Sequence, residues 1–194
     1  MSDARSRRWD ATHQRIYDVA LELFQAHGFE QVNVGQIVSG AGISVPTFYA
    51  HYPSKEHIIM QLPTAEEMTA LMASQPASLP VAERLRRAAP EWFALWSPEF
   101  REAQLVRWRV IATTPFLRTR AAEFERTTAE MLADALPAGS GGTPRRADQI
   151  VVNAYLAAFT AGMLAWADGN GERKLEEVVD EAFEALQELV PPGV

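Results

Sequence analysis

The chain has 194 residues, 47% of them hydrophobic and 22% charged, and its formal net charge is -7. This is the composition of a folded protein with one large domain, or with a small module joined to a medium one. Because there is no cysteine, disulfides and thiolate metal sites are excluded, and a reducing cytoplasm is the expected location. No apolar run approaches the ~20 residues of a membrane span and the start lacks a signal-peptide core, so we expect no membrane partner.

The negative charge is unevenly distributed, which bears on a nucleic-acid partner. An acidic surface repels phosphates. However, residues 1–60 carry five basic and six acidic side chains, whereas residues 61–194 carry 13 and 19. All four histidines also lie in the first third of the chain. The two parts differ in chemistry, and we therefore expect two modules.

Helical periodicity runs through the first module. Apolar side chains recur at helical spacing along a first helix, which we expect to begin near Asp10 or Thr12 and to end at Gly28. The residues before it are expected to form a disordered basic arm. A short second helix follows over 34–41, and Ser44 is placed to cap an equally short third helix.

The second and third helices are joined by a tight turn at Gly42, and together they predict a helix-turn-helix. In such a unit the first helix packs behind the second, whose outer side chains enter the DNA major groove. Phe48 falls on the inward face and is expected in the core. The outer face and two arginines of the arm are expected to contact DNA bases and phosphates. These candidates are Gln36, Ser44, Val45, Pro46, Thr47, Tyr49, His51, Lys55, Arg7 and Arg8.

A proline interrupts the helix that follows. We expect this fourth helix to have Ser54 as its N-cap and to break or kink near residues 62–64, where Pro63 lies. Thr64 is a new N-cap with Glu67 three residues later, which is the spacing of a capping box. Since this helix would join the two modules, a break there would act as a hinge.

The second module predicts longer helices, at 81–96, 98–113, 115–136, 146–168 and 175–190. The Gly- and Pro-rich segment 137–144 is expected to be a flexible loop. Strand and hairpin signals are nearly absent. The sequence therefore predicts an all-α fold of about nine helices. Residues 1–53 would form a three-helix DNA-binding head with its basic arm, and residues 54–194 a helical domain for effector binding and dimerisation.

Aromatic side chains are concentrated in the second module. Taken singly, most would be ordinary core residues, but as a set they favour an apolar pocket for a small apolar or amphipathic effector. The candidates are Trp92, Trp96, Phe100, Trp108, Phe116, Phe124, Tyr155, Phe159 and Met163. Arg107 and Arg109 would pair with an anionic ligand if either faced inward, although a solvated helix face is the commoner setting for both.

The last two predicted helices carry stripes that fit a second copy of the chain. Small residues on one helix would let a partner helix approach closely, and the apolar side of the other would complete a four-helix bundle across a two-fold axis. The candidates are Ala154, Ala158, Ala161, Gly162, Ala165, Val179, Phe183 and Leu186. We therefore expect a homodimer.

The stretch IYDVALELFQAHGFEQVNVGQIVSGAGISVPTFYAHYPSKEHII, residues 16–59, resembles the DNA-binding domain of TetR-family transcriptional regulators. It shares an apolar helix ending in Phe-x-x-x-Gly-Phe, an Ala-Gly-Ile-Ser turn, and Thr-Phe-Tyr-x-His-Tyr followed by Ser-Lys-Glu. The resemblance implies a homodimeric repressor that leaves a palindromic operator when a small molecule binds. By position it implies phosphate contacts from Thr47, Tyr49 and Lys55, and base contacts from Val45 and Pro46.

In the second module, the stretch that begins ATTPFLRTRAAEFERTTAEMLADAL and runs through Trp166 is similar to actinobacterial regulators of the mycofactocin-regulator type. That resemblance implies an acyl-CoA or fatty effector.

Other classes of function fit the residues less well. An enzyme would need a clustered nucleophile, base or metal set, and no spacing supplies one. The histidines form no metal-ligand pattern, so neither a metal nor a cofactor is expected. A ligand-responsive activator, or a helical ligand-binding protein that acts through a protein partner, remains the alternative.

Overall fold

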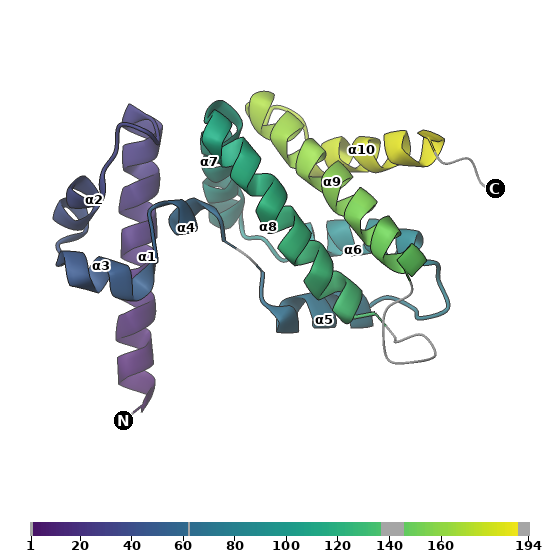
Figure 1. Cartoon of the computed structure of the whole chain (residues 1–194), viewed down its shortest axis with the longest axis horizontal. Coiled ribbons are helices and arrows are strands. Elements are labelled where there is room, and N and C mark those ends of the chain that lie inside the picture. The colour runs from purple at the N-terminus through teal and green to yellow at the C-terminus, as the bar shows by residue number, and fades with distance from the viewer. Residues whose placement is uncertain (1, 62, 137–145, 190–194) are drawn as a thin grey trace.

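The computed structural model describes residues 2–61, 63–136 and 146–189. Within them the fold is all-α, as predicted, with ten helices and no strand (Figure 1). The expected number was about nine. The difference arises at the predicted break or kink, because the count of nine took the interrupted fourth helix as one element and the structure has two helices there, α4 and α5.

The head consists of α1 (Ser2–His27), α2 (Val34–Ala41) and α3 (Val45–His51). Short-range signals set the turns between them. The side chain of Asn33 accepts the Gln36 backbone N–H, and the side chain of Gln36 accepts that of Asn33, which is a full capping box. Gly42 ends α2 with a φ of 62°, in the left-handed region that favours glycine. Ser44 caps α3 through the Thr47 N–H, as predicted.

α1 begins earlier than expected. It starts at Ser2, so the predicted start near Asp10 or Thr12 is wrong, and so is the disordered arm. The hydroxyl of Thr12 donates to the carbonyl oxygen of Arg8, one turn back and 2.9 Å away, instead of capping a helix end. Alanine and arginine in this extension are strong helix formers, and Trp9 anchors it to the head through a ring contact with α3.

The link between the modules is broken, as predicted. α4 (Glu56–Ile59) is a single turn, and α5 (Ala65–Ala73) starts anew. Thr64 and Glu67 form the expected capping box at the start of α5. Residue 62, within the predicted break, lies outside the described residues.

The predicted cap of α4 is wrong. The N-cap position is occupied by Lys55, which makes no side-chain capping bond. The hydroxyl of Ser54 contacts the His57 ring nitrogen Nδ1, 2.9 Å away, because the short turn brings that ring close.

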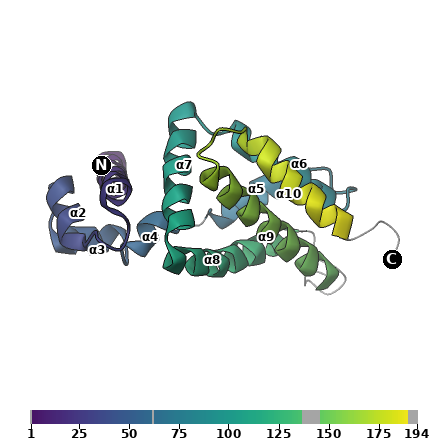
Figure 2. The ribbon, with the colours of Figure 1, turned by 90° about the horizontal axis from the view of Figure 1, so that it is seen from above.

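The remaining helices are α6 (Val81–Ala94), α7 (Pro98–Thr113), α8 (Pro115–Asp134), α9 (Arg146–Asp168) and α10 (Leu175–Leu189). Their positions agree with the five longer helices predicted. The predicted flexible loop at 137–144 lies outside the described residues. α9 lies at the centre of this part and packs against α6, α7, α8 and α10 (Figures 1 and 2).

Two hydrophobic cores hold the chain together. The first joins the head to the second module, since Phe24 and Phe48 share it with Ile58 and Ile59 of α4 and with Ile111 of α7. The second lies among α5, α6, α8, α9 and α10. Because the first core crosses the junction, the head and α7 stand side by side in both views of the chain (Figures 1 and 2).

α9 has an unusual apolar content. By length and composition it could cross a membrane, with a mean hydropathy of 1.6 over its most apolar window, although the sequence suggested no such run. The central helix of a soluble helical domain has the same properties. One third of the window is buried within the single chain.

Candidate DNA-binding face and effector cavity

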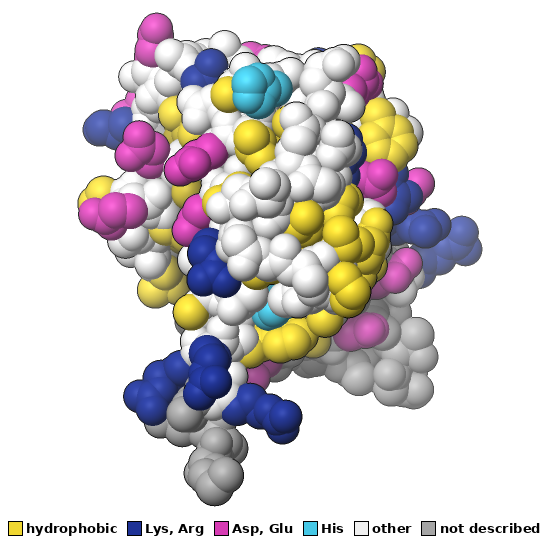
Figure 3. All heavy atoms as spheres, turned by 90° about the vertical axis from the view of Figure 1, so that its left-hand side faces the viewer, with side chains coloured by type: hydrophobic (Ala, Val, Ile, Leu, Met, Phe, Trp, Pro, Cys, Tyr) yellow, Lys and Arg dark blue, Asp and Glu magenta, His cyan; other side chains and the backbone are white. Residues whose placement is uncertain are grey.

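The outer face of α3 is apolar and open. Val45 is 45% exposed and Tyr49 54% exposed, and Ser44 and Pro46 are exposed beside them. Phe48 is fully buried, as predicted. Figure 3 shows this side of the molecule, with apolar side chains next to polar ones. A helix face of this kind offers methyl and ring contacts more than hydrogen bonds.

Three of the residues predicted to contact DNA also form hydrogen bonds within the head. Gln36 is exposed, and its side chain closes the capping box of α2. The hydroxyls of Ser44 and Thr47 share a hydrogen bond of 2.8 Å. These contacts fix the start of each helix, so the polar groups at the α2–α3 turn are held in place before any DNA arrives.

His51 packs against α1. Its ring stacks on Trp9, with centroids 3.8 Å apart, and lies 5.6 Å from the ring of His13. His13 in turn stacks on Tyr52, at 4.2 Å. Burial lowers the pKa of His51, and burial followed by the nearby His51 ring lowers the pKa of His13. Both rings are therefore held in the neutral form at pH 7.

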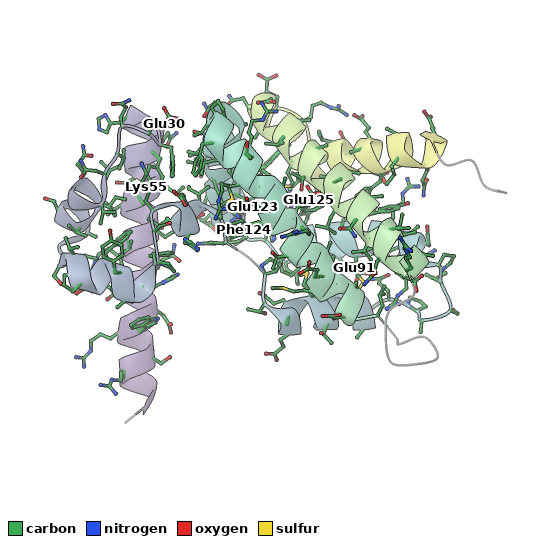
Figure 4. The ribbon with its side chains drawn as sticks, viewed as in Figure 1. Glu30, Lys55, Glu91, Glu123, Phe124 and Glu125 are labelled. Carbon is green, nitrogen blue, oxygen red and sulfur yellow. The ribbon has the colours of Figure 1, made fainter. Side chains whose placement is uncertain are left out.

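Lys55 is bound inside the head. Its ammonium donates hydrogen bonds to the carbonyl oxygens of Phe29 and Val32, each 2.8 Å long, and lies 4.3 Å from the centroid of the Phe29 ring. Burial lowers its pKa, while Glu56 and Glu30 favour the charged form (Figure 4). Lys55 thus ties the start of α4 to the α1–α2 loop. Only the third N–H of its ammonium is left for a phosphate.

The basic residues of the predicted arm lie on the helical extension of α1. Arg5, Arg7 and Arg8 are all exposed. In Figure 3 dark-blue side chains gather at the lower end of the face, around the first turns of this helix. A rigid helix, rather than a loose arm, presents these charges.

A cavity of about 320 Å³ lies in the second module, bounded by the α4–α5 linker and by α5 to α10. Eight of the nine predicted pocket residues line it: Trp92, Trp96, Phe100, Trp108, Phe124, Tyr155, Phe159 and Met163. Phe116 does not. It is 46% exposed at the start of α8, because the helix turns that side to solvent. Its place in the predicted pocket is therefore wrong.

Several lining residues were not predicted. Three are methionines, namely Met60, Met68 and Met72. Their signal was the apolar spacing around the Pro63 break, whereas the predicted set contained only aromatic residues and Met163. Polar groups line the cavity too: Gln61, Glu67, Gln104, Arg107, Glu125, Thr128 and Thr160.

Arg107 faces inward, whereas Arg109 is exposed. The Arg107 guanidinium donates three hydrogen bonds: Nε to the Ile59 carbonyl oxygen (2.5 Å), Nη2 to the Gln61 carbonyl oxygen (3.2 Å), and Nη1 to Gln104 Oε1 (2.9 Å). Burial lowers the pKa of Arg107. This side chain connects the cavity wall to the end of α4, at Ile59, and to the start of the α4–α5 linker, at Gln61.

A second contact joins the cavity to α4. Phe124 of α8 lines the cavity and meets the His57 ring edge-on, with centroids 6.3 Å apart. Figure 4 shows Phe124 and Glu125 on the same helix, on the part of the molecule beside the linker. This ring contact links the cavity wall to α4.

The eight residues predicted for the dimer interface fall into two groups that differ in burial. Ala161 and Ala165 are exposed, and Ala154, Ala158 and Leu186 are partly buried. This leaves an open strip of small residues along α9.

The other three predicted dimer residues are buried within one chain. Gly162 lies against α10, where a Cβ would come within 3.0 Å of the Val179 Cα atom. Val179 and Phe183 belong to the second core, and Phe183 lines the cavity. The structure therefore places these three between α9 and α10 of one protomer, where the two helices pack on each other.

Comparison with known proteins covers both modules. Residues 16–62 match the family described as bacterial regulatory proteins, tetR family, and residues 79–191 match the MftR C-terminal domain. The mycofactocin biosynthesis transcriptional regulator MftR of Mycobacterium tuberculosis is 33% identical over 141 residues, which are 70% of this chain and 69% of that protein. The transcriptional regulator EthR of Mycolicibacterium smegmatis is 38% identical over 53 residues, 27% of this chain and 24% of EthR.

Solved structures show the same fold at lower identity. NalD of Pseudomonas aeruginosa, the secondary repressor of an efflux pump, has a TM-score of 0.56 and 20% identity over 91% of this chain and 96% of its own. FadR of Bacillus subtilis, in complex with stearoyl-CoA, has a TM-score of 0.55 and 20% identity over 89% of this chain and 96% of its own.

Proposed function

Because the chain belongs to the TetR family of bacterial transcriptional regulators, we propose that it is a repressor that binds a palindromic operator as a homodimer. A small apolar or amphipathic molecule in the cavity would release it. One observation carries this proposal: the linker at α4 contacts both sites, through Arg107 on the cavity side and Lys55 on the head side. The protein would act in the cytoplasm, as a regulator and not as an enzyme.

In this proposal residues 1–53 read DNA. Val45, Pro46 and Tyr49 would meet thymine methyl groups and the groove wall, since they form the open part of α3. Phosphates would be held by Thr47 and by the arginines at the start of α1. Because these charges are few, specificity would depend strongly on operator shape, and the affinity would fall less steeply with salt than for a strongly basic binder.

Residues 54–194 would bind the effector and the second protomer. The exposed side chains of Ala161 and Ala165 on α9 are small enough to let a helix of the partner pack closely. A partner would cover apolar surface that the single chain leaves exposed on this helix. The resulting dimer would present two reading helices to the two halves of a palindrome.

The relatives and the cavity support an amphipathic effector. FadR was solved with stearoyl-CoA, and the C-terminal match is to the domain named after MftR. The cavity itself is lined mainly by aromatic and methionine side chains with a few polar groups, the usual make-up of a small-molecule site.

The test is selection of bound duplexes from fragmented genomic DNA, followed by titration of the selected sequence. We expect a palindromic site, with binding weakened on the order of tenfold or more by Tyr49→Ala. The matched control is Phe116→Ala, an exposed aromatic residue of α8 that should bind normally. Recovery of no common sequence, or identical binding by Tyr49→Ala, would refute the repressor proposal.

A further inference from the structure

We propose that the cavity is a receptor for an amphipathic carboxylate, whose acid group pairs with Arg107 in place of the linker carbonyls and thereby frees the α4–α5 linker. This rests on the proposed function for its consequence at DNA, but not for the binding step.

Arg107 is a cation without a counter-ion. Its three hydrogen-bond acceptors are two backbone carbonyls and one amide oxygen, all uncharged. In the described part of the chain no carboxylate lies within ion-pair distance of it, although Arg86 and Arg101 each pair with at least one. The phenol of Tyr17 is the ionisable group that favours its charged form, and a phenol is neutral at pH 7.

Arg107 is partly buried, so its guanidinium has lost part of its water, and the dipoles around it replace that water only in part. The lowered pKa of Arg107 reflects this loss. A ligand carboxylate would supply the missing charge through two parallel N–H···O⁻ bonds, which are about twice as strong as bonds to neutral acceptors.

The cavity has its own carboxylates, but neither serves Arg107. Glu67 is engaged at the start of α5, where it accepts from the N–H and the hydroxyl of Thr64. Glu125 lines the cavity from α8 without forming an ion pair in the described structure. Both would repel an acid group placed beside them, which leaves the Arg107 end as the favourable position for it.

The rest of the wall suits an apolar tail. Trp92, Phe159, Met68 and Met163 line it, and its volume of about 320 Å³ is at the small end of small-molecule sites. Decanoate is therefore a suitable probe, with decanol and decylammonium as analogues that carry no charge and the opposite charge on the same tail.

Pairing with a ligand would change α4. The Ile59 carbonyl is the last of this one-turn helix, and Arg107 is one of its two donors. Ile59 is also fully buried in the core that includes the head, and Lys55, just before α4, holds the Phe29 and Val32 carbonyls. Loss of the Arg107 bonds would thus loosen a segment that is tied to the head at both ends.

Binding is measured by calorimetry and tryptophan fluorescence. We expect decanoate to bind the wild-type protein about tenfold more tightly than decanol, with decylammonium weakest. Arg107→Met should abolish this preference, Arg107→Lys should keep part of it, and Arg109→Met should leave it intact. Circular dichroism confirms that each variant is folded. Equal binding of acid and alcohol to the wild type, no decanoate binding, or an acid preference that survives Arg107→Met would each overturn the inference.

Release of the linker is measured by hydrogen exchange of a peptide covering residues 56–61, without DNA. We expect decanoate, but not decanol, to speed exchange in the wild type and Arg109→Met. Unchanged exchange at saturating decanoate would refute the release step. If decanol released DNA as well as decanoate did, the repressor proposal would stand and the sensing role of Arg107 would fall. If the protein bound no DNA while the preference for the acid held, the sensing role of Arg107 would stand and the repressor proposal would fall.

Discussion

The indole of Trp9 stacks on the imidazole of His51, with ring centroids 3.8 Å apart. This contact joins the extension of α1 to the C-terminal end of the reading helix. It anchors the basic start of the chain to the head, and it gives the arginines there a fixed position relative to α3. The stability and the DNA affinity of the head should therefore depend on the same ring.

Trp9→Ala should destabilise the protein by about 1 kcal/mol, the usual worth of an aromatic pair, and should weaken operator binding because the extension of α1 loses its anchor. Urea unfolding and DNA titration measure the two effects. Trp9→Phe retains a ring and should lose less of each. Unchanged unfolding in Trp9→Ala would show that the stack contributes nothing to stability.

Stability should fall as the pH drops below the ordinary histidine pKa of 6.5. The pKa values of His13 and His51 are lowered in the folded protein, so the unfolded chain takes up protons first. The contribution of the two neutral rings to the free energy of unfolding is complete above pH 6.5. It is lost as the pH falls towards the lowered pKa values of the folded state.

The measurement is the urea midpoint between pH 7.5 and 5.5, in the wild type and in a His13→Gln/His51→Gln variant. The variant should show a smaller decrease, since it lacks both titrating rings. An identical decrease in the two proteins would place the pH dependence elsewhere.

Lys55→Met should destabilise the fold by roughly 1–3 kcal/mol, because two carbonyls of the α1–α2 loop lose their donor. Chemical unfolding gives the value. The control is Lys174→Met, whose exposed pair with Glu177 should be worth under ~1 kcal/mol. If Lys55→Met instead kept full stability and lost only DNA affinity, the predicted phosphate contact would be the main role of Lys55.

Gly162→Leu should destabilise each protomer by roughly 1–3 kcal/mol or more, because the new side chain meets the backbone of α10 at Val179. The neighbouring Ala161→Leu points to the exposed side of α9 and should leave protomer stability nearly unchanged. Thermal unfolding at low protein concentration separates the two. Equal effects would mean that both positions lie in the same environment.

Local signals in the sequence predicted the helices well. Gly42 and Ser44 delimit the turn of the helix-turn-helix, and Thr64 with Glu67 starts α5, because each acts through atoms within three or four residues along the chain. The start of α1 was predicted wrongly because no local signal marks it. Its anchor, Trp9 on His51, spans two helices and has no local signature.

Eight of the predicted pocket residues line the cavity, because their bulk and apolar character put them in the second module's interior whatever the exact packing. The sequence by itself thus determined the helical fold, the helix-turn-helix and the apolar nature of the cavity. Only the tertiary structure decided which way individual side chains turn: Arg107 towards the linker, Lys55 into the head and Gly162 against α10. Periodicity identifies an apolar face, but the rotation of that face and the partner it meets depend on helices far away in the chain.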